Sequence, residues 1–228
     1  MGLGKEQWDQ VENEIESKMG GGRLPLPPYV VSEITGDFKH FFMSLSRYKF
    51  AGKLLEGKHS MLEVGCNVGF KTMMFSQFVE YVTGIDYEEN AIAFAKENYT
   101  DEKRKYICAD FINMEPLEHR VDAVVSLDVI EHIEQENERR FMDEIVSNLD
   151  RDGICIIGTP NITAAQYQSE ISKIGHINMF DHKRLKDLMS QYFANVFMFA
   201  MNDEVVHTGF LPMAHYLFAV GTGVKNHK

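Results

Sequence analysis

The sequence predicts an α/β fold built on a mainly parallel β-sheet, and three observations support this prediction. Apolar segments of strand length alternate with segments of helical periodicity from residue 61 onward. The first apolar segment, 61–65, runs into a turn that contains glycine, and the second, 81–86, ends in an acid. Strands separated by helices form crossover units. A glycine turn followed by such an acid is typical of a nucleotide-like cofactor held at the top of a parallel sheet.

The segments before the sheet are predicted to be mostly helical. Residues 1–22 are polar and end in Gly20–Gly22, which predicts a short helix and a hinge. The proline-rich stretch 24–29 predicts extended backbone, and apolar residues at helical spacing predict a helix over 38–55. We assign 1–57 to an N-terminal helical lid and 58–228 to the sheet domain.

The sheet elements follow from hydrophobic periodicity. About a dozen residues without a helical pattern join the last two expected strands, so we expect these two strands to pair antiparallel at the sheet edge. We expect strands at 61–65, 81–86, 105–109, 121–127, 153–158, 195–201 and 214–221, and helices at 70–79, 88–98, 135–149 and 182–191.

Composition argues against several classes of partner. The 228 residues carry a formal net charge of −11, and binding phosphates requires clustered Lys and Arg, so we expect no nucleic-acid partner. No apolar run approaches the roughly 18 residues that span a bilayer, and the polar N-terminus lacks the apolar stretch of a signal peptide. Cys66, Cys108 and Cys155 lie far apart in or beside expected strands, which predicts buried free thiols. We expect a cytoplasmic protein with no membrane partner.

The glycine turn departs from the dinucleotide pattern G-x-G-x-x-G. Its spacing is Gly65-x-x-x-Gly69, with Asn67 between the glycines and Phe70 where a third glycine would come. Asn tolerates left-handed backbone better than most residues, so Asn67 can take the place of a middle glycine. The missing third glycine counts against a nicotinamide oxidoreductase.

Together with residues farther along, this turn resembles the class I S-adenosylmethionine-dependent methyltransferases. Their first motif runs acid-x-Gly-x-Gly-x-Gly, and this chain has Glu63 two residues before Gly65. Asp86 matches the acid that binds the cofactor's ribose, Asp110 matches the acid that contacts its adenine, and Asp128 lies in the turn after the fourth strand. The matches follow the order of the family along residues 47–221.

The resemblance implies a Rossmann-like sheet of seven strands with the last one antiparallel, and helices on both faces. It implies S-adenosylmethionine as cofactor and S-adenosylhomocysteine as product. From the residues alone, Asp86 and Asp110 keep a second interpretation as helix caps, and Arg47 keeps one as part of a surface ion pair. The implied cofactor contacts are Arg47, Glu63, Gly65, Cys66, Asn67, Gly69, Asp86, Tyr87, Asp110, Phe111, Leu127 and Asp128.

Histidines stand where the resemblance places the methyl acceptor. His132 follows the fourth strand, and His176 lies in a segment, 175–180, that resembles one over the acceptor pocket of ubiquinone-biosynthesis O-methyltransferases and sugar-modifying relatives. A hydroxyl acceptor must lose a proton, and histidine titrates near neutral pH. We assign His132 and His176 as catalytic, with a structural hydrogen bond as the alternative for His132. Acceptor contacts are assigned to Tyr29, Asn178 and His207.

The predicted function is O-methylation of a hydroxyl on a small polar acceptor, such as a sugar, a nucleotide sugar or a related metabolite. The tail 201–215 is similar to tails in methyltransferases of bacterial surface-carbohydrate assembly. Methylation of a nitrogen and a non-catalytic scaffold role stay open, as does the choice between a monomer and a homodimer.

A metal is the other use for these side chains, because carboxylates and imidazoles are metal ligands. No tight spacing such as H-x-x-x-H joins them, so we predict no metal site. The residues with suitable atoms are Asp128, Glu131, His132, His176, Asp181, His182 and His207.

Overall fold

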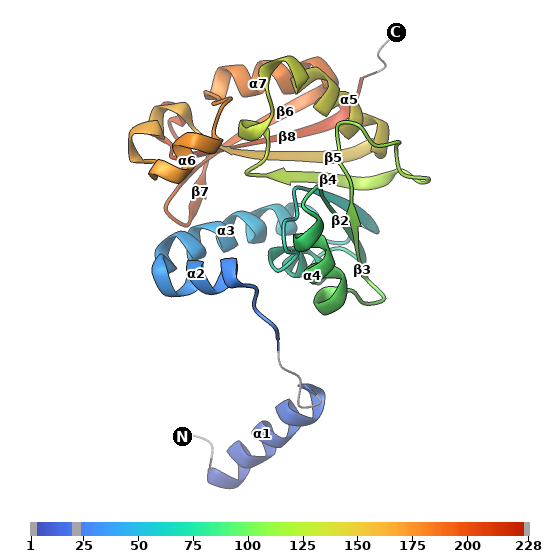
Figure 1. Cartoon of the computed structure of the whole chain (residues 1–228), viewed down its shortest axis with the longest axis vertical. Helices are drawn as coiled ribbons and strands as arrows, with labels where there is room; N and C mark the ends of the chain where they lie inside the picture. The colour runs from blue at the N-terminus through green and yellow to red at the C-terminus, as the bar shows by residue number, and fades with distance from the viewer. Residues whose placement is uncertain (1–3, 20–23, 226–228) are drawn as a thin grey trace.

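The computed structural model describes residues 4–19 and 24–225, and one sheet of eight strands forms its centre (Figure 1). The strand order is β3-β2-β1-β4-β5-β8-β6-β7. The first five strands are parallel to one another. The strands are β1 (Ser60–Val64), β2 (Tyr81–Asp86), β3 (Arg104–Cys108), β4 (Val121–Leu127), β5 (Leu149–Pro160), β6 (Phe193–Asn202), β7 (Val205–His207) and β8 (Tyr216–Val224).

The far end of the sheet corrects the predicted strand count. The last strand, β8, is antiparallel to both neighbours as predicted, but it lies between β5 and β6 and not at the edge. Residues 216–221 of β8 are all buried, which fits a strand with partners on both sides. The edge is β7, a strand of three residues that pairs with β6 and is too short for the sequence pattern to reveal.

Helices cover both faces of the sheet, as predicted, because successive strand residues point to opposite faces. One core packs α5 and α7 against the sheet and includes Val124, whereas the other packs α3 and η1 against it and includes Val125. The helices of the two cores and of the sheet's other end are α3 (Phe38–Leu54), the 3-10 helix η1 (Lys71–Gln77), α4 (Glu89–Tyr99), α5 (Glu138–Asn148) and α7 (His182–Tyr192).

Short helices carry most of the connections at the carboxyl ends of the strands. These connections matter because binding and catalytic residues concentrate on loops that a rigid scaffold positions. The short helices are η2 (Ile130–His132), η3 (Gln135–Asn137), η4 (Ile162–Tyr167), α6 (Glu170–Gly175) and η5 (Leu211–Met213).

Two segments differ from their predicted secondary structure. The stretch 24–29 is predicted to be extended, but Pro28 begins α2 (Pro28–Gly36), since proline suits the first turn of a helix. Val30 is 1% exposed, so packing outweighs the low helix propensity of the β-branched residues in α2. The helix predicted at 70–79 is the shorter 3-10 helix η1.

The N-terminal helix α1 (Lys5–Met19) is present as predicted, and it stands apart from the sheet (Figure 1). The hinge predicted at Gly20–Gly22 lies outside the described residues. By contrast, α3 buries Tyr48 and Ala51 in the core of the sheet.

The predicted domain boundary after residue 57 stays a prediction, because helices on its N-terminal side differ in whether they pack against the sheet. None of the helices that the structure describes is long and apolar enough to cross a membrane.

The cysteines correct one prediction. Cys66 and Cys155 are buried, but Cys108 is exposed at the end of β3. Its neighbour Ile107 packs against the core and Cys108 points the other way, because side chains alternate along a strand.

Candidate active site

A cleft of about 1000 Å³ opens at the carboxyl ends of β1, β4 and β5. Open α/β sheets bind ligands at this edge. Helices α2 and α3 form one wall, the turn after β1 lies beside them, and η4 with α6 forms the opposite wall. The predicted site residues on its surface are Tyr29, Arg47, Gly65, Cys66, Asn67, Leu127, Asp128, His132 and His176.

The turn after β1 owes its glycines to packing within the chain. Gly65 has φ +82°, and a Cβ there would lie 2.2 Å from Cγ2 of Val129. Gly69 has φ +73°, and its Cβ would lie 2.5 Å from Cε1 of Tyr106. Asn67 has φ +49°, which confirms that Asn replaces a middle glycine here. From the sequence, both glycines are assigned to the cofactor, and these two internal contacts are not predicted.

Asp86 connects this turn to the end of β2. Its Oδ2 accepts from the backbone N–H of Asn67 at 2.8 Å, and its Oδ1 accepts from that of Glu88 at 3.0 Å. Each carboxylate oxygen keeps a further lone pair for a ribose hydroxyl. Asp110 bonds within its own turn, to the N–H of Ile112. Asp86, Asp110 and Tyr87 are not among the residues that line the cleft, so their predicted contacts with the adenosine half stay predictions.

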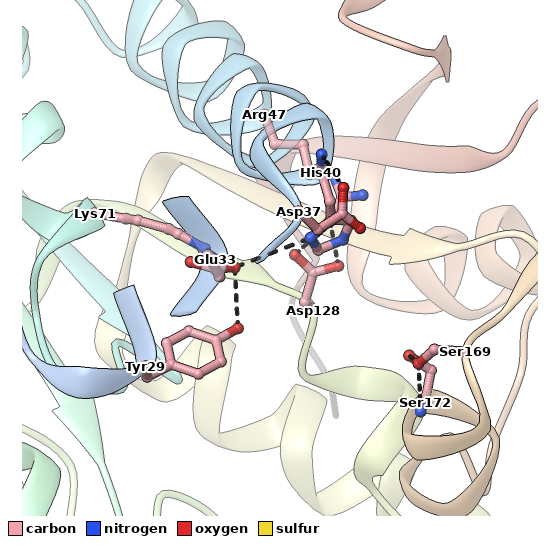
Figure 2. Close-up of polar contacts among 9 residues, drawn as sticks. All are labelled: Tyr29, Glu33, Asp37, His40, Arg47, Lys71, Asp128, Ser169 and Ser172. Atoms are coloured by element: carbon pink, nitrogen blue, oxygen red, sulfur yellow. Dashed lines mark hydrogen bonds and ion pairs between the residues drawn. The ribbon is translucent and has the colours of Figure 1, made fainter. Parts of the chain in front are cut away.

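Arg47 reaches from α3 to Asp128 on the turn after β4 (Figure 2). Its Nη1 lies 2.8 Å from both carboxylate oxygens, and its guanidinium carbon lies 3.9 Å from the centroid of the Tyr216 ring. Burial disfavours the charged guanidinium, but Asp128, together with Tyr216 and Glu131, outweighs burial and raises the pKa of Arg47. The predicted ion pair is therefore present, but inside the cleft and not on the surface.

Glu33 ties α2 to the start of η1 (Figure 2). Its Oε1 accepts from Lys71 Nζ and from the Tyr29 hydroxyl, each at 3.1 Å. The carboxylate is 9% exposed, and within the described chain its Oε2 has no hydrogen-bond partner. Helix α2 is thus held over the cleft by a charged contact to the residue that follows the glycine turn.

Glu63 lies behind the cleft wall. It is 1% exposed, and burial raises its pKa to about 7, while the hydroxyls of Thr72 and Tyr48 lower it. It does not line the cleft, so its predicted cofactor contact stays a prediction. Glu63 lies two residues before Gly65, the first residue of the glycine turn.

Three side chains meet where β4 and β5 end, and we call Glu131, His132 and His176 the acceptor corner. One nitrogen or carboxylate oxygen from each lies within 4.8 Å of the others, and the two imidazole centroids are 5.0 Å apart. His132 Nδ1 lies 2.8 Å from the carbonyl oxygen of Gly175. Thr159 Oγ1 donates to Glu131 Oε2 at 2.9 Å. The structural hydrogen bond considered for His132 therefore exists, and the ring still lines the cleft.

The protonation states in the acceptor corner follow from burial. Burial, together with the neighbouring His132, lowers the pKa of His176. Burial, together with the negative charge of Asp128, raises the pKa of Glu131 to about 8. At neutral pH, His176 is therefore a neutral imidazole.

Three predicted contact residues are not on the cleft surface, and their predicted contacts stay predictions. Phe111 points into the core, where its ring packs edge-on against Phe141. Asn178 is 5% exposed and donates to the Glu138 carboxylate. His207 bonds within its own hairpin and lies outside the cleft lining.

Sequence reasoning missed several residues in the two walls of the cleft. The segment after β5 contributes Gln168, Ser169 and Ser172, and Ser169 Oγ accepts from the backbone N–H of Ser172 (Figure 2). Glu33 lies on a helix that the sequence pattern hides. Lys71 could have been predicted as a site residue, because it is a cation two residues after Gly69, the last glycine of the turn.

The side chains present suit S-adenosylmethionine. Arg47 Nε is buried with no hydrogen-bond partner among the described residues, which fits a ligand carboxylate, and Lys71 adds a second cation. Asp128 offers negative charge for a sulfonium, and Asp86 offers acceptors for ribose hydroxyls. The cations suit the cofactor's carboxylate, Asp128 suits its sulfonium, and Asp86 suits its ribose.

Comparison with known proteins supports the same assignment. Residues 62–157 match the family model described as a methyltransferase domain. A probable S-adenosylmethionine-dependent methyltransferase of Mycobacterium tuberculosis is 29% identical over 101 residues, 44% of this chain and 35% of that protein. The mitochondrial ubiquinone biosynthesis O-methyltransferase of Dictyostelium discoideum is 32% identical over 130 residues, 51% of this chain and 40% of that protein. The chain thus spans less than half the length of these relatives.

A solved structure agrees in fold. The N-methyltransferase NodS of Bradyrhizobium japonicum, in complex with S-adenosylhomocysteine, superposes with a TM-score of 0.58 at 15% identity. The match covers 81% of this chain and 86% of that one. The predicted Rossmann-like methyltransferase fold and the predicted cofactor are confirmed.

Proposed function

We propose that this chain, which carries an S-adenosylmethionine-dependent methyltransferase domain, methylates a hydroxyl oxygen of a small polar acceptor. The observation that carries the proposal is the acceptor corner, where two imidazoles and a buried carboxyl group converge beside the cleft. An oxygen nucleophile needs a group that takes its proton, and this corner supplies such groups. The similarity to ubiquinone biosynthesis O-methyltransferases supports an oxygen acceptor.

The chain's own residues divide the work along the cleft. When bound, the cofactor supplies an electrophilic methyl group on a sulfonium sulfur. Arg47 and Lys71 would hold its carboxylate, and Asp128 would face its positive charge. Helix α2, tied down by Glu33, shields this region from water, which strengthens the electrostatic contacts inside.

The wall opposite α2 supports a polar acceptor. Gln168, Ser169, Ser172 and His215 line the cleft there and can donate to or accept from hydroxyl groups. An acceptor held by several such bonds is aligned for in-line attack, and alignment alone lowers barriers by several kcal/mol. A sugar or a nucleotide sugar offers the matching hydroxyls, and we place these compounds within the proposal as the preferred acceptors.

Calorimetric titration with S-adenosylhomocysteine, with NADH as the comparison ligand, tests the cofactor half. We expect micromolar binding of the first and none of the second. Transfer of a labelled methyl group to a panel of sugars and nucleotide sugars then tests the acceptor half, with mass spectrometry to locate the new methyl group. A methyl group found only on nitrogen would overturn the assignment to oxygen.

His176→Ala tests the role of the corner in turnover. We expect at least a tenfold lower rate, in the usual range for a lost proton-transfer group, with binding of S-adenosylhomocysteine changed by less than about threefold. His59→Ala is the matched control, since this histidine is exposed and paired with Glu80 away from the cleft. Equal losses of rate and of cofactor binding in His176→Ala would contradict the assignment.

A further inference from the structure

We infer that the acceptor corner binds one divalent transition-metal ion through Glu131, His132 and His176. The inference rests on the proposed function and deepens it, because the ion would lie where the acceptor hydroxyl is held. It also reverses the prediction of no metal, which relied on spacing along the chain. The three ligand atoms lie within 4.8 Å of one another, although 44 residues separate His132 from His176 along the sequence.

Glu131 provides the strongest indication of a missing partner. Its side chain is 0% exposed, and Thr159 satisfies only Oε2. Within the described residues Oε1 has no hydrogen-bond partner. A buried polar atom without a partner is costly, on the order of 1–3 kcal/mol, so native structures seldom leave one. A cation bound by Oε1 would remove this cost and would stabilise the ionised carboxylate.

His132 is oriented as a metal ligand. Its Nδ1 meets the Gly175 carbonyl oxygen at 2.8 Å, and a carbonyl only accepts, so Nδ1 carries the proton. The lone pair is therefore on Nε2. Histidines that bind metals almost always donate their other ring N–H to a backbone carbonyl or a carboxylate in this way. Gly175 keeps the contact close, since a Cβ there would lie 3.1 Å from Cε1 of His132.

His176 is positioned by a side-chain amide. Its Nδ1 lies 3.0 Å from Nε2 of the Gln168 amide, which also donates to the sulfur of Met179. In this orientation Nδ1 accepts, so binding of an ion at Nε2 requires a flip of the amide, which exchanges its oxygen and nitrogen. With the oxygen toward His176, Nδ1 donates and Nε2 is free to bind an ion. Gln168 thereby holds this ring as Gly175 holds that of His132.

The donor set indicates the class of ion. Two imidazoles and one carboxylate suit Zn²⁺, Mn²⁺, Fe²⁺ or Co²⁺ better than Mg²⁺ or Ca²⁺, which prefer oxygen ligands throughout. Three protein ligands leave at least one position open, as in catalytic metal sites. A hydroxyl bound there would ionise more readily, because a bound divalent ion stabilises the oxygen anion. Asp128 lines the same cleft as His132 and His176 and adds a further carboxylate on this side of it.

The test measures metal binding directly on the full chain. The protein is freed of metal with a chelator and titrated with Co²⁺, whose visible absorption reports ligand number and geometry, and with Zn²⁺ by calorimetry. We expect one site per chain. His132→Ala and His176→Ala should each weaken Zn²⁺ binding at least tenfold, and Glu131→Gln should do so too. His59→Ala, which removes a histidine beside the exposed Glu80, should leave the affinity unchanged.

The outcomes separate this inference from the proposed function. No Co²⁺ spectrum, or Zn²⁺ binding that survives all three substitutions, would overturn the metal site. Binding of S-adenosylhomocysteine in the same sample would then leave the methyltransferase proposal standing. If Glu131→Gln fails to fold, Zn²⁺ binding by His132→Ala still tests the metal site, because His132 is exposed and its ring contributes no core packing. Metal binding without any cofactor binding would uphold the metal site and remove the proposed function.

Discussion

The two halves of the cleft are built in different ways. The turn half, Gly65 to Gly69 with Asp86, comes from two neighbouring strands and is held by backbone geometry, with positive φ at Gly65, Asn67 and Gly69. The acceptor corner joins side chains from segments far apart in the chain, supported by Thr159 and Gln168. A site made by backbone conformation leaves a local sequence pattern, whereas one made by converging side chains leaves almost none.

Gly65→Ala should break the turn half and has the largest expected effect. The positive φ costs about 1–2 kcal/mol for a residue with a Cβ, and overlap with Val129 adds about 1–3 kcal/mol. We therefore expect the free energy of unfolding to fall by about 4 kcal/mol in urea titrations. Gly57→Ala is the matched control, with the same φ of +82° and no atom within 4 Å. Equal losses in both variants would show that packing against Val129 contributes nothing.

Glu63→Gln tests how the buried carboxylate beside the turn half makes stability depend on pH. Its folded pKa of about 7 lies above its ordinary value of 4.5, so the folded state binds this proton more tightly. The contribution of this group to the free energy of unfolding is fully present below pH 4.5. It declines as pH rises toward 7 and is lost above pH 7. The substitution removes that dependence. Relative to the wild type, the variant should gain on the order of 3 kcal/mol between pH 4.5 and pH 8.

Unfolding in urea at both pH values measures this gain. A difference between the two proteins that stays constant across pH would contradict a neutral Glu63 in the folded state.

Asp128→Asn tests the contact that joins the two halves and has the smallest expected effect. Asn keeps the tolerance for the φ of +59° at this position, so only the charge changes. Arg47 is left without its partner, but Asp128 is 35% exposed, so solvent limits the loss to about 2 kcal/mol. Adding Arg47→Met should restore part of that stability. Strictly additive losses in this double-mutant cycle would mean that the two residues are not coupled.

The elements of the sheet were largely predictable, and the exceptions have physical reasons. Seven strands and the covering helices follow from periods of two and 3.6 residues, which burial imposes. Helix α2 was not predicted, because packing of Val30 outweighs local helix propensity. The position of β8 inside the sheet was not predicted either, because strand pairing leaves no local sequence pattern. Phe111 and Asn178 illustrate the converse, since two residues assigned to the site from sequence motifs are buried here, one in the core and the other beside Glu138.

The cofactor was indicated by the resemblance to a known family. The sequence by itself determined the parallel sheet and the left-handed turn with Asn67 in place of glycine. These are local properties, set by which φ values, burial patterns and turn residues a short segment allows. Only the tertiary structure decided that Arg47 pairs with Asp128 within the cleft, that Glu33 ties α2 to Lys71, and that Glu131 meets two histidines. Such contacts arise from side chains brought together by the sheet, and their distances in space bear no fixed relation to their separation along the chain.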